Sequence, residues 1–185
     1  MRTLIVTEFI SLDGVIEAPG GDEGYKHTGW TFDLEPDPTM YDFKLDETRS
    51  ADALLIGRRT YESFAGAWPE REGEFADKFN SMPKYVVSST LTDPAWNNTT
   101  VIGFEDVAAL REGDGGPIQV AGSGTLARGL HKAGLVDQWN LMVFPVVLGS
   151  GARLFPTDAE DKQKLELVDH RAYANGVQLQ VFRTA

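Results

Sequence analysis

The feature that most constrains the fold is a repeated alternation of short apolar segments with segments of helical periodicity. Short runs of β-branched and apolar residues predict strands, and apolar residues three or four positions apart predict helices. Parallel strands need a crossover between them, so this alternation favours a mostly parallel α/β sheet. Strands are expected at residues 3–10, 53–56, 85–87, 99–102, 118–121 and 136–147, and helices at 39–50, 60–66, 73–82, 105–111 and 125–133.

The last part of the chain has a different pattern. Residues 165–170 and 177–183 alternate apolar and polar side chains on either side of Asn175-Gly176, a dipeptide typical of hairpin turns. A hairpin requires antiparallel pairing, so the expected sheet is mixed. The length of 185 residues suits one domain, residues 1–185, and the sequence contains no internal repeat and no linker. Thr39 is the expected N-cap of the first helix.

The composition excludes several classes of function. A net charge of −11 argues against a nucleic-acid or anionic-membrane partner, because phosphates are bound mainly by lysine and arginine. The lack of cysteine excludes disulfides and thiolate metal sites, and the histidines are too scattered to suggest a metal. Glu8 interrupts the apolar start of the chain, and no stretch reaches the ~20 apolar residues of a membrane span. We therefore expect a cytoplasmic protein.

Small and polar residues directly follow three of the expected strands. Ligands of open α/β sheets lie at the carboxyl ends of parallel strands, where glycine allows close approach and free N–H groups at a helix start attract anions. Arginine adds a forked donor for phosphate. Each turn alone could be a strand end, a pair of solvated arginines or a packing feature, but together they predict one wall of a dinucleotide site. The three turns are Gly57-Arg58, Ser88-Ser89 and Gly122-Ser123-Gly124.

The same turns resemble the cofactor segments of dihydrofolate reductases. Residues 57–63 (GRRTYES) resemble the family's G-R-x-T-[WY]-E-S segment, residues 87–89 (VSS) its second segment and residues 121–124 (AGSG) its third. Residues 11–14 (SLDG) and 145–151 (PVVLGSG), with Leu154-Phe155, are similar to the reductase domain of riboflavin biosynthesis and its stand-alone bacterial relatives. The resemblance covers essentially the whole chain. It implies an α/β, dihydrofolate-reductase-like three-layer fold, with a central mixed, mostly parallel sheet and a C-terminal antiparallel hairpin.

The resemblance also implies that NADPH is the cofactor, and it assigns residues to each part of it. The family's third segment usually carries two glycines joined by a cis peptide bond. Here the second is Ser123, and a cis bond before a residue other than proline costs ~3 kcal/mol, so the geometry of this bond is left open. Arg58, Arg59 and Ser89 would hold the 2′-phosphate; Thr60, Gly122, Ser123, Gly124 and Thr125 the pyrophosphate; Val87 would pack against adenine; Val15 and Ile16 would lie near the nicotinamide; and Gly57, Ser88 and Leu126 are also expected at the cofactor.

The proton donor and the substrate contacts are less closely defined. In dihydrofolate reductases a carboxylate early in the second structural element assists protonation, which indicates Asp42, beside Tyr41; Asp13 is the other candidate for a catalytic role. An exposed helix carboxylate and an ordinary Asp-Gly turn are the alternatives. Trp30 lies in the long loop 11–38. It is expected either to contact the substrate as a lid over a flat ring or to anchor the loop.

The expected function is that of an enzyme, an NADPH-dependent reductase of a small pyrimidine- or pterin-like heterocycle, resembling 5-amino-6-(5-phosphoribosylamino)uracil reductase. Dihydrofolate reduction is an alternative of the same class. A non-catalytic NADP-binding sensor or scaffold is an alternative of another class, because one fold hosts many functions. Relatives of this kind often form homodimers through their tail strands, and the apolar residues 141–148 suit either such a contact or an internal strand.

Overall fold

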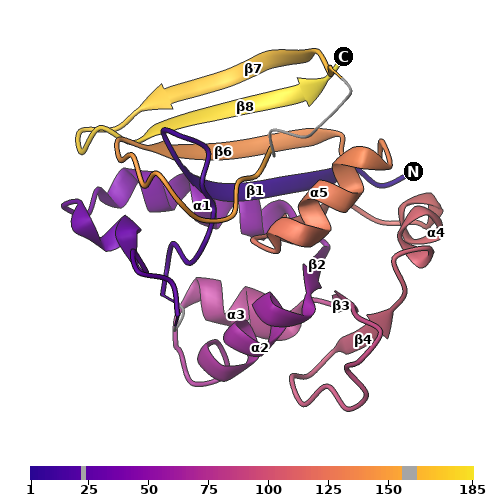
Figure 1. Ribbon diagram of the computed structural model, residues 1–185. Helices are drawn as coiled ribbons and strands as arrows, with labels where there is room; N and C mark the ends of the chain where they lie inside the picture. Colours follow the sequence, from indigo (N-terminus) through magenta and orange to yellow (C-terminus); the bar gives the residue numbers. More distant parts are fainter. Residues whose placement is uncertain (22–23, 156–161) are drawn as a thin grey trace.

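The fold is organised around one mixed sheet (Figure 1). The computed structural model describes residues 1–21, 24–155 and 162–185. In these residues eight strands form a single sheet in the order β4-β3-β2-β5-β1-β6-β8-β7. The strands are β1 (Leu4–Ser11), β2 (Ala53–Gly57), β3 (Lys84–Val87), β4 (Thr99–Ile102), β5 (Ile118–Ala121), β6 (Gln138–Phe144), β7 (Leu165–Ala172) and β8 (Gln178–Thr184).

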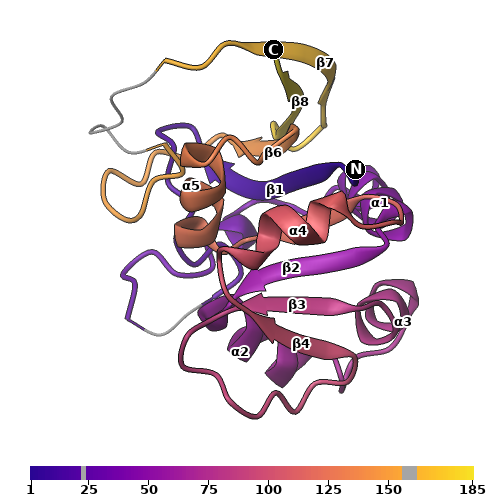
Figure 2. The ribbon, with the colours of Figure 1, turned by 90° about the vertical axis from the view of Figure 1, so that its right-hand side faces the viewer.

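Helices cover both faces of the sheet, which gives three layers (Figure 2). Leu54 and Ile56 of β2 pack on one face and Leu55 on the other. A strand covered on both faces is continuously apolar, which explains the unbroken apolar run at 53–56. One face carries α1 (Pro38–Ser50), α2 (Arg58–Ala67) and α3 (Glu74–Ser81), and the other carries α4 (Asp106–Glu112) and α5 (Gly124–Lys132). The short 3-10 helix η1 (Trp30–Asp33) lies between β1 and α1 in the chain.

No helix among the described residues is long and apolar enough to cross a membrane.

β1 is an inner strand of the sheet with a parallel neighbour on each side. It pairs in parallel with β5, from Leu4↔Ile118, and with β6, from Ile5↔Gln138. β2, β3 and β4 extend the parallel part, whereas β8 is antiparallel to β6 and β7 is antiparallel to β8. The carboxyl ends of β1, β2, β3, β5 and β6 therefore lie at one edge of the sheet, which we call the carboxyl edge.

The predicted helices and strands are confirmed, with differences at a few ends. α2 begins at Arg58, two residues before the predicted start, so both arginines lie in its first turn. The cap of α1 is Asp37, not Thr39: the Asp37 carboxylate accepts hydrogen bonds from the Thr39 backbone N–H (3.0 Å) and from Thr39 Oγ1 (2.6 Å). Thr39 is therefore a donor to the cap and not the cap itself.

The strand predicted at 136–147 is shorter in the structure. β6 ends at Phe144, because Pro145 has no N–H with which to continue the ladder. β6 lies between β1 and β8, and its Leu141 and Met142 are buried inside the molecule. The apolar residues up to 144 therefore form an internal strand and are not available to a second copy of the chain. The homodimer stays a prediction from the resemblance.

Replacing the observed cap tests its assignment. Asp37→Ala removes the acceptor for the N–H of Thr39 and also the acceptor for the N–H of Ala174 (3.0 Å). We therefore expect Asp37→Ala to unfold at a clearly lower urea concentration than the wild type. Thr39→Val leaves the Asp37 carboxylate in place and should cost less than about 0.5 kcal/mol. Urea unfolding followed by circular dichroism measures both, and an equal loss in the two variants would contradict the assignment.

Candidate cofactor and substrate site

The three turns predicted to bind the cofactor lie side by side. β3, β2 and β5 are parallel neighbours in the sheet, so the turns that follow them meet at the carboxyl edge. The structure thus brings together Ser88-Ser89, Gly57-Arg58 and Gly122-Ser123-Gly124, which are far apart in the sequence.

A side chain of the third turn joins it to the first. Ser123 Oγ accepts a hydrogen bond from the Gly57 N–H (2.9 Å) and donates one to Thr60 Oγ1 (2.8 Å). Gly122 and Ser123 both have left-handed backbones, with φ +55° and +67°, and the peptide bond between them is trans. The Ser123 hydroxyl is thus engaged within the protein, whereas Thr60 keeps its own hydroxyl proton for a ligand.

Two helix N-termini open onto this junction. α2 begins at Arg58 and α5 at Gly124, and no side chain caps either helix. The N–H groups of an uncapped first turn, together with the helix dipole, favour a bound anion. The Arg58 side chain is half exposed and has Glu62 as a distant ion-pair partner, with Nε 3.7 Å from Oε1. The site can therefore offer backbone donors and a guanidinium to a phosphate.

The two serines of the middle turn, Ser88 and Ser89, have different roles. Ser88 Oγ accepts hydrogen bonds from the N–H groups of Thr90 (3.2 Å) and Leu91 (3.0 Å), so it stabilises the turn itself. Ser89 is exposed at the edge, and Val87 is half-buried against the core. Of the two hydroxyls, that of Ser89 is the one placed to reach a ligand.

The segment Val15-Ile16 closes the site on the side of β5. Val15 pairs with Arg153, and the Ile16 N–H donates to the carbonyl of Ala152 (2.9 Å). A Cβ at Gly124 would lie 2.6 Å from Ile16 Cδ1, so a larger residue at 124 would displace the end of the Ile16 side chain. Val15 is fully buried, and Leu126 is 6% exposed. At Val15 and Leu126, therefore, the backbone and not the side chain is what a cofactor could contact.

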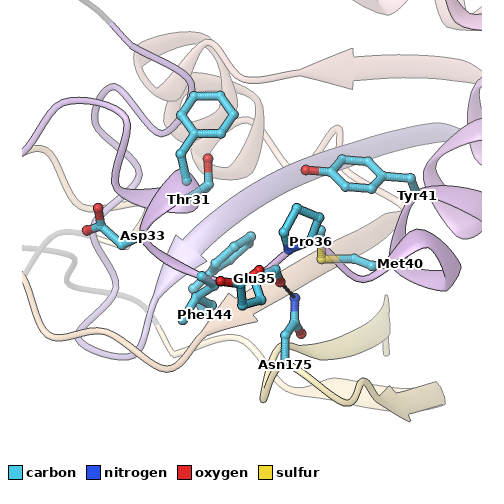
Figure 3. Close-up of a pocket in the computed structure, with 10 residues that line it drawn as sticks. Thr31, Asp33, Glu35, Pro36, Met40, Tyr41, Phe144 and Asn175 are labelled. Atoms are coloured by element: carbon cyan, nitrogen blue, oxygen red, sulfur yellow. Dashed lines mark hydrogen bonds between the residues drawn. The ribbon is translucent and has the colours of Figure 1, made fainter.

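A pocket of about 260 Å³ lies between the long loop and the start of α1 (Figure 3). One wall is Phe144, the last residue of β6, so the pocket also lies at the carboxyl edge. Its lining combines apolar side chains with two carboxylates: Thr31, Phe32, Asp33, Leu34, Glu35, Pro36, Met40, Tyr41, Phe144 and Asn175.

The chain matches a known family along nearly its whole length. The model of the RibD C-terminal domain matches residues 2–179. The chain belongs to this family. Two relatives from Bacillus subtilis (strain 168), the uncharacterized proteins YyaP and YwjB, are each 29% identical to it. The YyaP match spans 95% of this chain and 92% of the relative, and the YwjB match spans 98% of each.

Solved structures of related proteins show the same fold. A putative riboflavin biosynthesis protein from Shewanella sp. PV-4 superposes with a TM-score of 0.73 at 19% identity, over 100% of this chain and 99% of that one. A pyrimidine reductase-like protein from Corynebacterium diphtheriae gives a TM-score of 0.68 at 14% identity, over 100% of this chain and 92% of that one. The dihydrofolate-reductase-like three-layer fold predicted from the sequence is thereby confirmed.

Trp30 is an anchor in this member of the RibD C-terminal domain family and not a lid. Its side chain is 2% exposed, its Nε1 donates to the carbonyl of Glu17 (2.8 Å), and its ring packs edge-on against Phe144 at 5.3 Å. The aromatic residue of the loop that lines the pocket is Phe32, which is 70% exposed. The sequence could not separate the two, because both are aromatic residues of the same loop.

Asp13 is a structural clamp. It accepts hydrogen bonds from Ser11 Oγ (2.7 Å) and from the N–H groups of Leu148 (3.1 Å) and Gly149 (2.8 Å), and Arg153 Nη2 lies 3.6 Å away. Desolvation raises the pKa of Asp13, but these hydrogen bonds outweigh it and lower the pKa to about 2. A carboxyl group with so low a pKa is almost never protonated at neutral pH, so Asp13 is a poor proton donor.

Asp42 does not face the pocket. It is exposed on α1, whereas its neighbours Met40 and Tyr41 line the pocket. Its charge acts instead on Tyr173, whose phenol is partly desolvated; burial and nearby carboxylates raise the pKa of Tyr173. Neither carboxylate proposed from the sequence is therefore placed as a proton donor within the pocket.

A charged residue that the sequence reasoning treated only as an interruption is buried near the site. Glu8 of β1 is 3% exposed, and its Oε1 has no hydrogen-bond partner among the described residues. Burial raises the pKa of Glu8 to about 8, although the charges of Lys44 and Arg128 oppose this. The feature of the sequence that could have identified Glu8 is the presence of an acidic residue within an otherwise apolar strand.

No cluster of three or more potential metal ligands occurs in the part of the chain that the structure describes.

The clamp role of Asp13 predicts a pH-dependent loss of stability. Its folded-state pKa lies below the unfolded value of 3.8, so ionised Asp13 stabilises the fold above pH ~4, and this contribution is lost as the pH falls towards 2. Asp13→Asn should lower the free energy of unfolding by about 2 kcal/mol at pH 7 and about half as much at pH 3. Urea unfolding measures this, with Asp114→Asn as an exposed control. A pH-independent difference would contradict the role.

The junction at Ser123 predicts different costs for two substitutions. Ser123→Ala leaves the Gly57 N–H without its acceptor and should lower the free energy of unfolding by about 1–2 kcal/mol. Ser123→Gly loses the same hydroxyl but relieves the left-handed backbone, which recovers about 1 kcal/mol. Thermal unfolding of the two variants gives the comparison. If the glycine variant is no more stable than the alanine variant, the backbone at 123 is not strained as described.

Proposed function

We propose that the protein is an NADPH-dependent reductase of a small pyrimidine- or pterin-like heterocycle. The observation that carries this proposal is the meeting of the three turns at the carboxyl edge, where Ser123 links Gly57 and Thr60. The uncapped first turns of α2 and α5 offer backbone N–H groups there, to which an anion could bind, and Arg58 adds a guanidinium. A dinucleotide diphosphate needs several donors of this kind within one concave site.

The site has features that distinguish the parts of the cofactor. Arg58 and Ser89 lie at the β2 and β3 turns and would hold the 2′-phosphate, while the N–H groups at the starts of α2 and α5 would hold the pyrophosphate. Ile16, packed on Gly124, would contact the nicotinamide. NADPH supplies a hydride to an electrophilic carbon when it is bound. The protein's own task is then to hold the acceptor in the adjoining pocket and to exclude water.

The pocket supports a small, flat substrate. Its volume of about 260 Å³ is close to the lower limit for small-molecule sites, and Phe144 and Phe32 provide aromatic surface. Asp33 and Glu35 are acceptors suited to the N–H groups of an aminopyrimidine or a pterin. The names of the superposed proteins, which refer to riboflavin biosynthesis and pyrimidine reductase, favour the same class.

NADPH binding to an Arg58 variant tests the cofactor assignment. In isothermal titration the wild type should bind NADPH more tightly than NADH. Arg58→Ala should weaken NADPH about tenfold and NADH less than about twofold, because only NADPH has the 2′-phosphate. Arg183→Ala is the matched control, since this exposed arginine pairs in register with Gln138 at the start of β6, away from the carboxyl edge. Equal affinity of the wild type for the two cofactors would contradict the assignment.

The same purified protein separates the catalytic alternatives. Turnover of dihydrofolate at the rate of a dedicated enzyme would favour dihydrofolate reduction over the reduction of a pyrimidine. Tight NADPH binding without oxidation by any pyrimidine, pterin or flavin would favour a sensor or scaffold.

A further inference from the structure

The interface between α1 and the sheet is polar where a core is normally apolar. Burying polar and charged groups costs free energy even when they are paired, so packing alone does not account for such an interface. The groups come from α1 and from three adjacent strands. They are Lys44, Glu47 and Thr48 of α1, Thr7 of β1, Gln119 of β5 and Asn140 of β6, of which all but Lys44 are buried.

Glu47 is the centre of this cluster. Its Oε1 accepts a hydrogen bond from Asn140 Nδ2 (2.6 Å), and its Oε2 accepts one from Thr7 Oγ1 (3.0 Å) and one from Lys44 Nζ (2.7 Å). Lys44 Nζ also donates to Thr7 Oγ1. The ammonium of Lys44 is thus held in place by a carboxylate that is itself fixed from two strands.

Lys44 retains one proton outside this cluster. Two of its three ammonium protons are used by Glu47 and Thr7, and no acceptor for the third is found among the described residues. The side chain is 13% exposed, compared with 4% for Glu47, so the ammonium is not sealed off. Nζ lies 5.4 Å from the ring centroid of Phe9, which is only partly buried. The free donor therefore lies beside an accessible aromatic ring.

The same ring connects Lys44 to the pocket. Phe9 packs edge-on against Phe144, a pocket wall, with ring centroids 5.5 Å apart. Along α1, Lys44 follows Met40 and Tyr41 by one turn, and both of these line the pocket (Figure 3). The Lys44 ammonium therefore lies beside Phe9, which separates it from the pocket wall Phe144, and one helical turn beyond Met40 and Tyr41.

Thr7 connects the cluster to the cofactor turns. The pair Thr7↔Ala121 is the last of the β1–β5 ladder, and Gly122 follows Ala121 directly. The Lys44 ammonium and the third cofactor turn thus adjoin the same residue of β1. A substrate ring that reached Phe9 from the pocket would meet the ammonium that lies over Phe9, with the proposed nicotinamide site close by.

We propose that Lys44 is the catalytic acid, which binds an oxygen or nitrogen at the reduced double bond and protonates it. The inference rests on the proposed function. As a ring carbon accepts the hydride and its electron pair, the π electrons of the C=N or C=O bond move to the heteroatom. The heteroatom then forms a bond to a Lys44 proton as that N–H bond breaks, and the neutral amine regains a proton from water. The substrate class is a planar heterocycle with a polarised C=N or C=O bond.

Other charged groups near the pocket are less suited to this role. Glu47 already accepts three hydrogen bonds within the cluster, and Glu8 lies within β1 with little exposure. Asp33 and Glu35 line the pocket on its loop side, away from the cluster under α1. The ammonium of Lys44 combines a fixed position, a remaining proton and a side chain that is 13% exposed.

Steady-state kinetics on the full chain test the proposal. The variants are Lys44→Met, Lys44→Arg and, as a matched control, Lys132→Met, which removes an exposed charge on α5. NADPH affinity by isothermal titration should stay within about twofold in all three. With dihydrofolate or 5-amino-6-(5-phosphoribosylamino)uracil as substrate, kcat should fall about 100-fold or more in Lys44→Met, recover in part in Lys44→Arg and be unchanged in Lys132→Met.

A second measurement on the wild type is independent of turnover and of the folding of a variant. In protein with isotope-labelled lysine, the Lys44 ammonium resonance is assigned by its loss in Lys44→Arg. Uracil or dihydrofolate, added with NADP⁺, should shift this resonance and leave that of Lys132 unchanged. An unmoved Lys44 signal with both compounds, or a wild-type kcat in Lys44→Met, overturns the proposal. Failure of the wild type to bind NADPH would overturn the proposed function, and this inference with it.

Discussion

Parallel pairing on both sides of β1 is the constraint on which the rest of the structure depends. Because β5 and β6 run in the same direction as β1, the turns after all three strands lie at one edge. Successive side chains of β1 point to opposite faces, so Val6 and Ile10 join the core under α5, whereas Thr7 and Phe9 face α1. The turn after β5, proposed to bind the cofactor, and Phe144 at the end of β6, a wall of the pocket, therefore lie on the two sides of β1.

One wall of the proposed cofactor site is held in place by Asp13, whose carboxylate lies outside the pocket. Asp13 binds the N–H groups of Leu148 and Gly149, which fastens the turn after β1 to a segment 135 residues later in the chain. The fastened segment positions Ile16 against Gly124, where a Cβ at 124 would lie 2.6 Å from Ile16 Cδ1. Ionised Asp13 thus contributes to the shape of the proposed cofactor site. Its hydrogen bonds, which give it this structural role, are also the reason that it is a poor acid.

The sequence allowed prediction of those features that are encoded locally. Strands such as 53–56 were found from their apolar runs, and the turns that meet at the carboxyl edge from the small residues that follow the strands. Features set by distant contacts were not predictable: Asp37 as the helix cap, Trp30 as an anchor and Ser123 as a link between two turns each depend on partners that only the fold brings close. The apparent candidates Asp13 and Asp42 were chosen by type and position in the chain, which do not reveal where a carboxylate points.

The polar residues of α1 were visible in the sequence, but their meaning depends on burial. An amphipathic helix normally turns its apolar side to the sheet, whereas α1 places Lys44, Glu47 and Thr48 there. On the opposite face of β1, Glu8 is buried with its pKa raised to about 8. Because the pKa of Glu8 is higher in the folded than in the unfolded state, Glu8 contributes to the stability of the fold below pH ~4.5, and this contribution is lost as the pH rises through 8. β1 therefore carries unfavourable buried groups on both faces, close to the carboxyl edge.

The stability of the fold does not explain why these buried polar and charged groups lie together, since burying each of them costs free energy. Apolar residues of similar volume would pack under α1 at no electrostatic cost, and buried ion pairs can often be replaced in this way without loss of stability. Proteins tend to depart from well-packed, apolar interiors at the places where they bind or react. Here the departure lies between the pocket and the turns proposed to bind the cofactor, and it fixes one ammonium group in position. The polar interface is thus better understood as part of the site than as part of the core.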